Sequence, residues 1–325
     1  MSQRRVGASG LLVSPTGLGC NNFGRSGTAT ETLAGTREVI DAAIANGITL
    51  LDTADMYGAV AGRSEELMGE ALEGRRDRVV LATKFGQERD MGYEFPGARA
   101  SRRYVRRAVE ESLRRLRTDW IDLYQLHLPD PGTPIAETTD ALDDLVREGK
   151  IRYYGHSNFT GWQIAEAEFT SRERSTGRFI SAQNHYSLLA RAAEREVLPA
   201  VERYGLGFFP YFPLHNGLLT GKFTREGGPA SSRIMSTRRH VWEQAPWEAI
   251  EGFRAFCDER GITMLQASFG WLLAQQAVSS VIAGATTSAQ VEANAAAGEA
   301  WRPDAAELAL IDSLFPLPED PGARV

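Results

Sequence analysis

A parallel α/β barrel is the fold class that this sequence predicts, and two features carry the prediction. First, eight short apolar runs alternate with helical patterns between residues 16 and 300, which is typical of a parallel sheet with crossover helices. Second, polar residues with complementary chemistry end three of these runs, at Asp52, Lys84 and His127. In a closed (β/α)8 barrel the C-terminal strand ends converge on one face, where active sites lie. On pattern alone, an open doubly wound sheet is the alternative.

The expected strands are short and are bounded by turn or helix signals. The runs ITLLD (48–52), VVLATK (79–84) and IDLYQLH (121–127) are the clearest. Ser64 and Ser101 each supply a capping hydroxyl at the start of a helical pattern. We expect strands near residues 16–20, 48–53, 79–84, 121–126, 152–157, 179–184, 206–212 and 279–283, and further helices near 136–149, 162–172, 194–204, 247–260, 264–276 and 288–298.

Three other segments have their own signals. Residues 4–13 predict a short hairpin that turns at Ser9-Gly10. Residues 216–245 have no clear periodicity and are rich in Gly, Ser, Thr and Arg; loops of this length in compact domains are usually functional or disordered. Residues 87–99, which include Tyr93 and Phe95, predict a loop over the same face as the strand ends.

Composition limits the class of protein. The chain has 325 residues, of which 42% are hydrophobic and 24% charged, and we expect one domain over residues 1–325, because α/β barrels reach this length. The net charge of −6, with no strongly basic block, argues against a nucleic-acid partner. Two distant cysteines and five scattered histidines show no disulfide framework or metal-ligand spacing. Without an apolar leader or an apolar run of membrane-spanning length, the sequence predicts a cytoplasmic protein with no membrane span.

Five motifs, in this order along the chain, resemble the aldo-keto reductase superfamily. They are L-D-T-A-D-M-Y-G (51–58), A-T-K-F (82–85), L-Y-Q-L-H (123–127), K-I-R-Y-Y-G-H-S-N (150–158) and I-A-G-A (282–285). The resemblance covers nearly the whole chain and is strongest to the branch that includes the potassium-channel β subunits. It implies a barrel whose bottom is plugged by the N-terminal hairpin, and it implies reduction of a small-molecule carbonyl substrate with NADPH.

The chemistry of four residues fits carbonyl reduction. No side chain donates hydride, so a nicotinamide cofactor is required. Tyr57 is the expected proton donor; the ordinary pKa of a tyrosine is about 10, and the ammonium group of Lys84 would favour the phenolate and lower that pKa. Asp52 would fix Lys84 by an ion pair. His127 would hydrogen-bond the carbonyl and orient it, or assist the proton transfer.

The cofactor has to be bound without the usual dinucleotide fingerprint. Residues 17–24, G-L-G-C-N-N-F-G, depart from G-x-G-x-x-G because the third glycine falls two places late, so we interpret them as a strand-to-loop turn. The resemblance implies that Ser157, Asn158 and Gln183 bind the nicotinamide carboxamide and that Tyr211 stacks on the ring. It also implies that the phosphates and the adenosine contact Leu214, Gly217, Lys222, Arg233, Gly284, Gln290 and Asn294.

Four apolar residues are the expected walls of the substrate pocket. They are Phe23, Met56, Phe85 and Phe212, chosen by their positions beside the predicted strand ends. Phe212 stands where a serine is usual in the family. An apolar, aromatic-lined pocket suits aldehydes or ketones of modest polarity. Core packing is the alternative role for each of these side chains.

Three functions remain compatible with these residues. The first is an NADPH-dependent reductase of aldehydes or ketones. The second is an NADPH-binding regulatory or partner-binding subunit with vestigial activity, because the channel β subunits keep the same four residues. The third is an aldolase-like barrel enzyme, in which Lys84 would form a Schiff base. The sequence does not specify an oligomeric state and leaves a homo-oligomer open.

Overall fold

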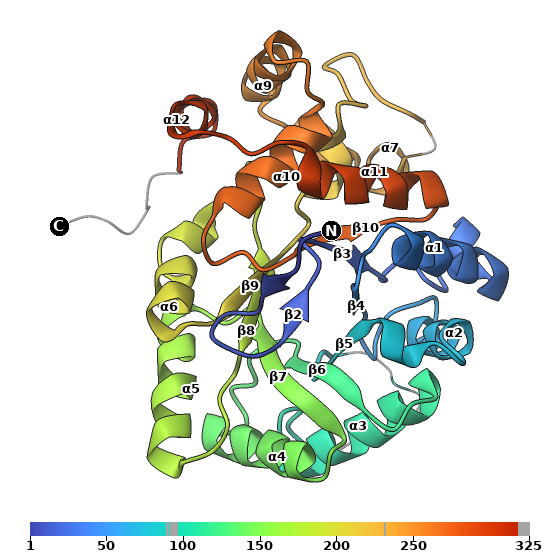
Figure 1. Cartoon of the computed structure of the whole chain (residues 1–325), viewed down its shortest axis with the longest axis vertical. Helices are drawn as coiled ribbons and strands as arrows, with labels where there is room; N and C mark the ends of the chain where they lie inside the picture. Colours follow the sequence, from blue (N-terminus) through green and yellow to red (C-terminus); the bar gives the residue numbers. More distant parts are fainter. Residues whose placement is uncertain (89–90, 92–96, 231, 318–325) are drawn as a thin grey trace.

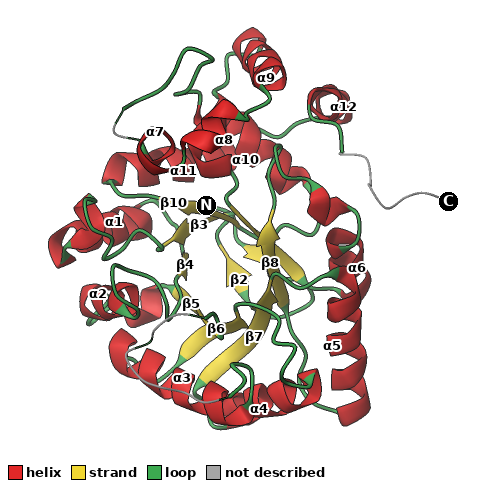
Figure 2. Cartoon of the chain, turned by 180° about the vertical axis from the view of Figure 1, so that it is seen from behind, coloured by secondary structure: helices red, strands yellow, loops and turns green. Residues whose placement is uncertain are grey.

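A ring of eight parallel strands, surrounded by helices, forms the body of the protein (Figures 1 and 2). The computed structural model describes residues 1–88, 91, 97–230 and 232–317. The ring order is β10-β3-β4-β5-β6-β7-β8-β9. It closes between β9 and the segment before β10, where the Phe208 N–H donates to Ala277 O (2.8 Å) and the Ser279 N–H donates to Phe208 O (2.9 Å). The predicted (β/α)8 barrel is therefore confirmed, and the open sheet is excluded.

Each expected strand is present, with small shifts at its ends. The strands are β1 (Arg4–Arg5), β2 (Leu12–Val13), β3 (Thr16–Gly19), β4 (Leu50–Asp52), β5 (Val80–Phe85), β6 (Ile121–Leu126), β7 (Ile151–Ser157), β8 (Ser181–His185), β9 (Gly207–Tyr211) and β10 (Val281–Gly284). The α-helices are α1 (Leu33–Ala45), α2 (Arg63–Ala71), α3 (Arg102–Leu116), α4 (Ile135–Arg147), α5 (Gly161–Arg174), α6 (Val197–Tyr204), α7 (Arg233–Thr237), α8 (Arg239–Glu243), α9 (Trp247–Glu259), α10 (Met264–Ala274), α11 (Ser288–Ala300) and α12 (Ala305–Leu314). Short 3-10 helices are η1 (Ala29–Glu31), η2 (Arg76–Arg78), η3 (Ala192–Glu194) and η4 (His215–Thr220).

Of the two helix caps predicted from the sequence, one is present and one is not. Ser101 caps α3 as predicted, and its hydroxyl accepts from the Tyr104 N–H (3.4 Å). Ser64 does not cap α2; Gly62 precedes that helix, and the Ser64 hydroxyl instead donates to Cys20 O (2.9 Å). Helices α1 and α12 were not predicted from the sequence. The 216–245 segment, expected as a loop, contains η4, α7 and α8.

The interior of the barrel is lined by residues that alternate along the strands. Side chains in a strand point to opposite faces in turn, so one residue in two faces inward. The lower interior is a separate apolar cluster of Val6, Val13, Leu50, Ala82, Leu123, Phe209 and Ile282. Two residues beyond Leu50, Ala82, Leu123 and Phe209, on the same inward face, the chain places Asp52, Lys84, Gln125 and Tyr211. The strand pattern itself thus puts polar side chains at the upper end of an apolar barrel.

The N-terminal hairpin closes the lower end of the barrel. Strands β1 and β2 pair antiparallel, with Arg4 opposite Val13, and Figure 1 shows β2 lying across the middle of the ring. Val6 and Val13 of this hairpin have no exposed surface and pack against the strand starts. The hairpin and its role as a plug are confirmed.

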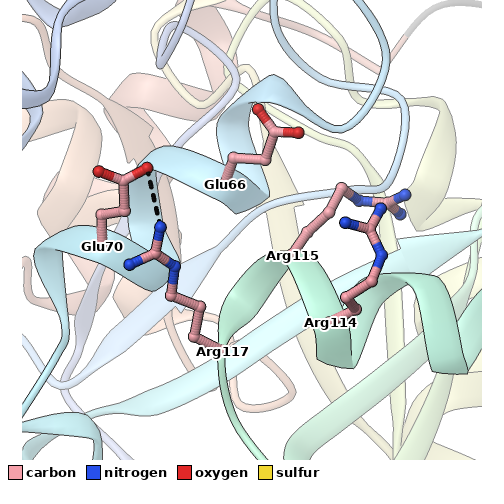
Figure 3. A pocket seen from close by; sticks show the side chains of 5 residues that line it. All are labelled: Glu66, Glu70, Arg114, Arg115 and Arg117. Carbon is pink, nitrogen blue, oxygen red and sulfur yellow. Dashed lines mark ion pairs between the residues drawn. The ribbon is translucent and has the colours of Figure 1, made fainter.

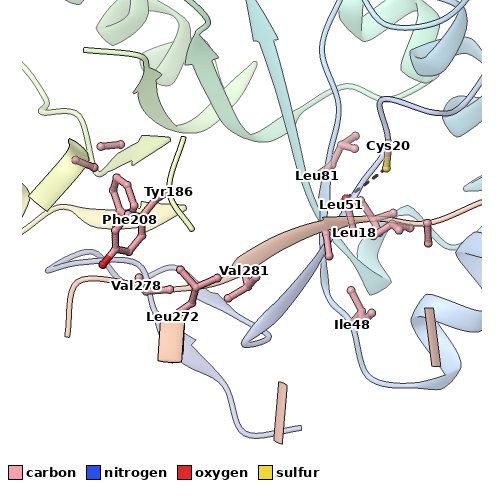
Figure 4. Close-up of a cluster of buried hydrophobic side chains, with 14 of the residues drawn as sticks. Leu18, Cys20, Ile48, Leu51, Leu81, Tyr186, Phe208, Leu272, Val278 and Val281 are labelled. Carbon is pink, nitrogen blue, oxygen red and sulfur yellow. Dashed lines mark hydrogen bonds between the residues drawn. The ribbon is translucent and has the colours of Figure 1, made fainter. Parts of the chain in front are cut away.

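A second and larger apolar core fills the space between the strands and the helices. Outward residues of the strands, such as Leu51, Leu81 and Phe208, pack there with helical residues such as Leu272 (Figure 4). Fully burying one such side chain contributes about 1.5–3 kcal/mol. Among the described residues, no helix has the length and apolar character needed to cross a membrane.

His156 is a buried outward residue with a consequence for stability. Its ring stacks on Phe159 (centroids 4.3 Å apart) and meets the edge of Phe179. Neither ring nitrogen has a hydrogen-bond partner among the residues that the structure describes. Burial lowers the pKa of His156 to about 3 from 6.5. Between these two pH values the unfolded chain binds a proton that the folded chain does not, so the free energy of unfolding falls as pH falls through this window.

We therefore expect His156→Phe to reduce the sensitivity of the protein to mild acid. Between pH 7 and pH 5, wild type should lose about 2 kcal/mol more of its free energy of unfolding than the variant, since each pH unit below 6.5 is worth about 1.36 kcal/mol per group. Urea unfolding at both pH values measures the difference within each protein. Replacing the exposed His240 by Phe serves as the control. Equal losses in wild type and His156→Phe would contradict the assignment.

Candidate active site

A buried ion pair joins the ends of β4 and β5. The Lys84 ammonium lies 2.7 Å from Asp52 Oδ2 and donates a second hydrogen bond to Thr53 O (2.8 Å). Lys84 has no exposed surface, and Asp52 is 4% exposed. Gln125 and Gln183 both donate to the other carboxylate oxygen of Asp52, at 3.3 and 3.1 Å. The carboxylate is therefore fully engaged and holds the ammonium group in one place.

Tyr57 lies directly over this pair. The segment that follows β4 turns back through a hydrogen bond from the Asp55 N–H to Lys84 O (3.0 Å). The Tyr57 ring centroid is 5.3 Å from Lys84 Nζ and 5.9 Å from the His127 ring, which it meets edge to face. The predicted tetrad of Asp52, Tyr57, Lys84 and His127 is thus brought together at one point.

The charges of the tetrad affect one another. Burial raises the pKa of the Tyr57 phenol, and the charge of Lys84 and its hydrogen bond only partly oppose this effect. Burial acts to lower the pKa of Lys84, but Asp52 and Tyr57 outweigh it, so this pKa lies above its ordinary value. The sequence led us to expect a lowered pKa for Tyr57; in the structure, the effect of burial exceeds that of the ammonium group, and the pKa is raised.

His127 is neutral under ordinary conditions. Burial, reinforced by the positive charge of Lys84, lowers the pKa of His127 to about 3. Its Nδ1 atom is buried and has no partner in the described part of the chain. The backbone is fixed on both sides, since the His127 N–H donates to Phe85 O (2.8 Å) and its carbonyl accepts from Asn158 Nδ2 (3.0 Å). A neutral imidazole ring can hydrogen-bond a ligand without adding a second positive charge beside Lys84.

The four residues expected around the nicotinamide form a connected network. Ser157 Oγ donates to Gln183 O (2.7 Å), and Asn158 Nδ2 donates to Ser157 Oγ (3.0 Å). The Tyr211 hydroxyl donates to Asn158 Oδ1 (2.8 Å), which fixes the orientation of the ring. Asn158 has a φ of 63°, a left-handed conformation that asparagine adopts more readily than most residues. Gln183 also reaches Asp52, so the network joins the tetrad.

The residues expected at the phosphates lie on the segment after β9. Leu214 O accepts from the Gly217 N–H (2.8 Å), and Gly217 has a φ of 109° that only glycine adopts easily. Lys222 is exposed just beyond η4, and Arg233 begins α7. Neither cation has a carboxylate within ion-pair distance among the described residues.

The residues expected at the adenosine lie where β10 leads into α11. Gly284 ends β10 and is exposed. The Gln290 side chain accepts from the Thr286 N–H (2.8 Å) and so shapes the turn between the two elements. Asn294, one helical turn further, is 7% exposed. The three residues thus follow one strand-to-helix turn, as expected.

The expected pocket walls separate into two groups. Phe23 and Phe85 have no exposed surface and belong to the outer core, where Phe85 stacks on Tyr124 (centroids 4.6 Å apart). Met56 and Phe212 are partly exposed. Packing is therefore the role of the first two, and only the second two can face a ligand in this conformation. Tyr93 and Phe95, expected in a loop over this face, lie outside the described residues.

A charged cleft lies between α2 and α3, on the outer wall of the barrel (Figure 3). Its charges are largely paired within the protein, as in the Arg117–Glu70 contact (3.3 Å). Arg115 turns inward from this cleft and binds the fully buried Glu65 (2.7 Å). Because the cleft includes no member of the tetrad, we assign it no part in the chemistry. In the described part of the chain, no group of three or more His, Cys, Asp and Glu side chains is placed to hold a metal ion.

Comparison with known proteins agrees with the geometry. The model of the aldo/keto reductase family matches residues 15–315. The chain belongs to this family. An uncharacterized oxidoreductase of Bacillus subtilis, YrpG, is 36% identical over 98% of this chain and 97% of its own length. Versiconal hemiacetal acetate reductase of Aspergillus parasiticus is 33% identical over 84% and 85% of the two chains. A probable voltage-gated potassium channel subunit beta of Arabidopsis thaliana is 30% identical over 90% of each. Membership and these relatives support a carbonyl reductase role.

Sequence reasoning missed two polar residues of this aldo/keto reductase site. Gln125 is fully buried and donates to Asp52; a Cβ atom on the neighbouring Gly155 would lie 3.3 Å from Gln125 Cγ and 2.2 Å from Ser181 Oγ. His185 stacks on Tyr211 with ring centroids 5.5 Å apart. Gln125 lies two residues before His127, and His185 lies two residues after Gln183. Because side chains alternate along a strand, this spacing could have predicted that both face the site.

Two further histidines, His215 and His156, have different positions relative to the site of this aldo/keto reductase. His215 stacks on His185 (centroids 5.6 Å apart) and therefore belongs to the aromatic group around Tyr211. Burial, with the charge of His215, lowers the pKa of His185 to about 4. His156 lies on the outer side of β7 and does not reach the site.

Proposed function

We propose that this aldo/keto reductase reduces aldehydes or ketones to alcohols with NADPH, and that Tyr57 supplies the proton. The observation that carries the proposal is the buried Lys84–Asp52 pair beneath the partly exposed Tyr57, with the neutral His127 ring next to it. This arrangement places a proton donor, a fixed cation and a neutral hydrogen-bonding group around one point.

The residues suit proton transfer to a carbonyl oxygen. His127 would hydrogen-bond and orient that oxygen. The centre of the Tyr57 ring lies 5.3 Å from the ammonium group of Lys84, which cannot move away. When Tyr57 gives up its proton, a negatively charged phenolate therefore forms close to a fixed positive charge. The attraction between them is larger after transfer than before it, so Lys84 stabilises the reaction more than the starting state. Asp52 keeps Lys84 charged and in place.

The cofactor residues fit a nicotinamide dinucleotide. NADPH would supply hydride to the carbonyl carbon. Tyr211, whose hydroxyl is held by Asn158, offers a fixed flat ring, and Ser157, Asn158 and Gln183 would bind the carboxamide. Lys222 and Arg233 would bind phosphate, with Leu214 and Gly217 shaping the segment before them. Partial burial, with the charges of Arg25 and Arg238, lowers the pKa of Arg233 to about 10, so an anion is electrostatically favoured there.

We expect NADPH to bind more tightly than NADH. The 2′-phosphate is the one group that distinguishes the two, and a charge-assisted hydrogen bond to Lys222 or Arg233 is worth about 1.5–3 kcal/mol. The dissociation constant for NADPH should therefore be about 10-fold to 100-fold lower. A fluorescence titration of the protein with each cofactor measures both constants. Equal affinities, or tighter NADH, would refute the 2′-phosphate role.

The other two functions give different results in a turnover assay. A partner-binding subunit would bind NADPH but would not oxidise it measurably faster in the presence of a carbonyl. The name of the Arabidopsis relative, a channel subunit, is the reason to test this function. A Schiff-base enzyme would need a deprotonated lysine. Lys84 is held as an ammonium ion by Asp52 and its pKa is raised, so the structure disfavours that chemistry.

A further inference from the structure

Arg25 lies on a loop that is tied to the segment carrying Tyr57. This loop connects β3 with η1 and α1. The Ala59 N–H, two residues beyond Tyr57, donates to Gly24 O (2.8 Å). The Arg25 side chain is partly buried and donates to Asn21 O (3.3 Å). The guanidinium group is thus held by its own loop, and that loop is joined to the backbone two residues beyond the proton donor.

Arg238 reaches the same region from a distant part of the chain. It follows α7, which begins at Arg233. Its Nη1 atom donates to Asn216 Oδ1 (2.6 Å), and its Cζ atom is 5.7 Å from the centre of the Phe212 ring. Phe212 in turn contacts Tyr211, with centroids 5.3 Å apart. Arg238 therefore lies beside the aromatic group at the upper end of the barrel.

The guanidinium groups of Arg25, Arg233 and Arg238 lie close enough to repel one another. Burial and the charge of Arg238 lower the pKa of Arg25, while a charge on Tyr57 would raise it. Burial and the charges of both neighbours lower the pKa of Arg233 to about 10. In the described structure none of the three forms an ion pair with a carboxylate.

Other arginines on this part of the chain are paired. Arg239, the residue after Arg238, lies 3.1 Å from Glu243, and Arg225 lies 2.8 Å from Glu251. Arg233 and Arg238, like Lys222, thus lack such a counter-charge among the described residues of this segment, in contrast to Arg225 and Arg239. Concentrated positive charge without a neighbouring acid is unfavourable, and a bound anion would relieve the repulsion.

We propose that Arg25, Arg233 and Arg238 form a single anion-binding site, which receives a phosphate or carboxylate group of a molecule that lies beside Tyr57. The proposal rests on the proposed reductase function and extends it to Arg25 and Arg238. Two molecules could supply the anion: the cofactor, through its phosphates, or a carbonyl substrate that carries an acidic group. Guanidinium groups bind both anions through paired N–H donors.

The experiment compares Arg25→Gln and Arg238→Gln with wild type and with Arg239→Gln. The last variant removes the same charge from the neighbouring, ion-paired position. Three quantities are measured: the affinity of the free protein for sodium pyrophosphate by calorimetry, the dissociation constant of NADPH by fluorescence, and kcat/KM for 4-carboxybenzaldehyde relative to its methyl ester. Arg25→Lys keeps the charge and should retain most of the wild-type value in whichever measurement responds.

Loss of one charge-assisted hydrogen bond should change the responding quantity by about 10-fold to 100-fold. If the anion belongs to the cofactor, the affinities for NADPH and pyrophosphate fall and the acid-to-ester ratio stays constant. If it belongs to the substrate, the acid-to-ester ratio falls and NADPH affinity stays constant. Changes no larger than those of Arg239→Gln in all three quantities would overturn the proposal.

The same measurements separate this proposal from the proposed function. A wild-type protein that binds NADPH and reduces carbonyls, with no effect in either variant, would leave the reductase function intact and reject the arginine site. A wild-type protein that binds pyrophosphate in an Arg25-dependent manner, but neither binds NADPH nor reduces a carbonyl, would keep the anion site and reject the reductase function.

Discussion

Tyr57→Phe should lower the turnover of carbonyl reduction by about 100-fold to 10,000-fold, the usual contribution of a positioned proton donor. The variant loses the hydroxyl but keeps the ring that meets His127 edge to face. NADPH binding should therefore change little. Steady-state kinetics with one aldehyde, together with the dissociation constant of NADPH, separate loss of chemistry from loss of binding.

Tyr124→Phe provides the matched control for this result. Tyr124 lies on β6, is fully buried, and its hydroxyl has no hydrogen-bond partner among the described residues. It faces outward, where it stacks on Phe85. Removing this hydroxyl should leave turnover close to the wild-type value. Wild-type turnover in Tyr57→Phe would reject Tyr57 as the proton donor.

Lys84→Met should destabilise the protein by about 3–5 kcal/mol, because it leaves Asp52 buried without its counter-ion. Gln125 and Gln183 would still donate to the carboxylate, but neither carries a charge. Turnover should fall as well, since the phenolate of Tyr57 would form without a neighbouring cation. Urea unfolding measures the free energy of unfolding, and kinetics on the folded variant measure the second effect.

The double variant Asp52→Asn, Lys84→Met distinguishes an ion pair from general packing. Neither partner then carries a charge, so the double variant should be more stable than Lys84→Met alone. Its turnover should remain low because the ammonium group is still missing. If Lys84→Met loses less than about 1 kcal/mol, the value of a surface pair, the two charges do not form the buried pair described above.

The positions of three members of the tetrad, Asp52, Lys84 and His127, could be predicted because the barrel strands obey a simple alternation. Leu50, Ala82 and Leu123 face inward, and the site residues follow each of them two or four places later. The same rule exposes one error. Phe85 follows Lys84 by a single residue, so it faces the outer core and cannot line the pocket through that face. Gln125 could have been found by the same count.

Other features depend on contacts between distant segments, which one sequence does not reveal. Glu65 and Arg115 pair across 50 residues between α2 and α3. Phe23 stands beside a predicted strand end, yet it has no exposed surface and belongs to the outer core. The pKa of Tyr57 depends on burial as well as on Lys84, and only the folded structure gives the balance between them.

Helix α12, in contrast, could have been predicted from the sequence, since Asp304 and Glu307 form a capping box at its start.

The most direct test is the rate of NADPH oxidation by wild type in the presence of a panel of aldehydes and ketones. Tyr57→Phe is run in parallel under the same conditions. We predict carbonyl-dependent oxidation by wild type that falls by at least about 100-fold in the variant. The contradicting result would be a wild-type protein that binds NADPH but, with every carbonyl tested, oxidises it no faster than the Tyr57→Phe variant does.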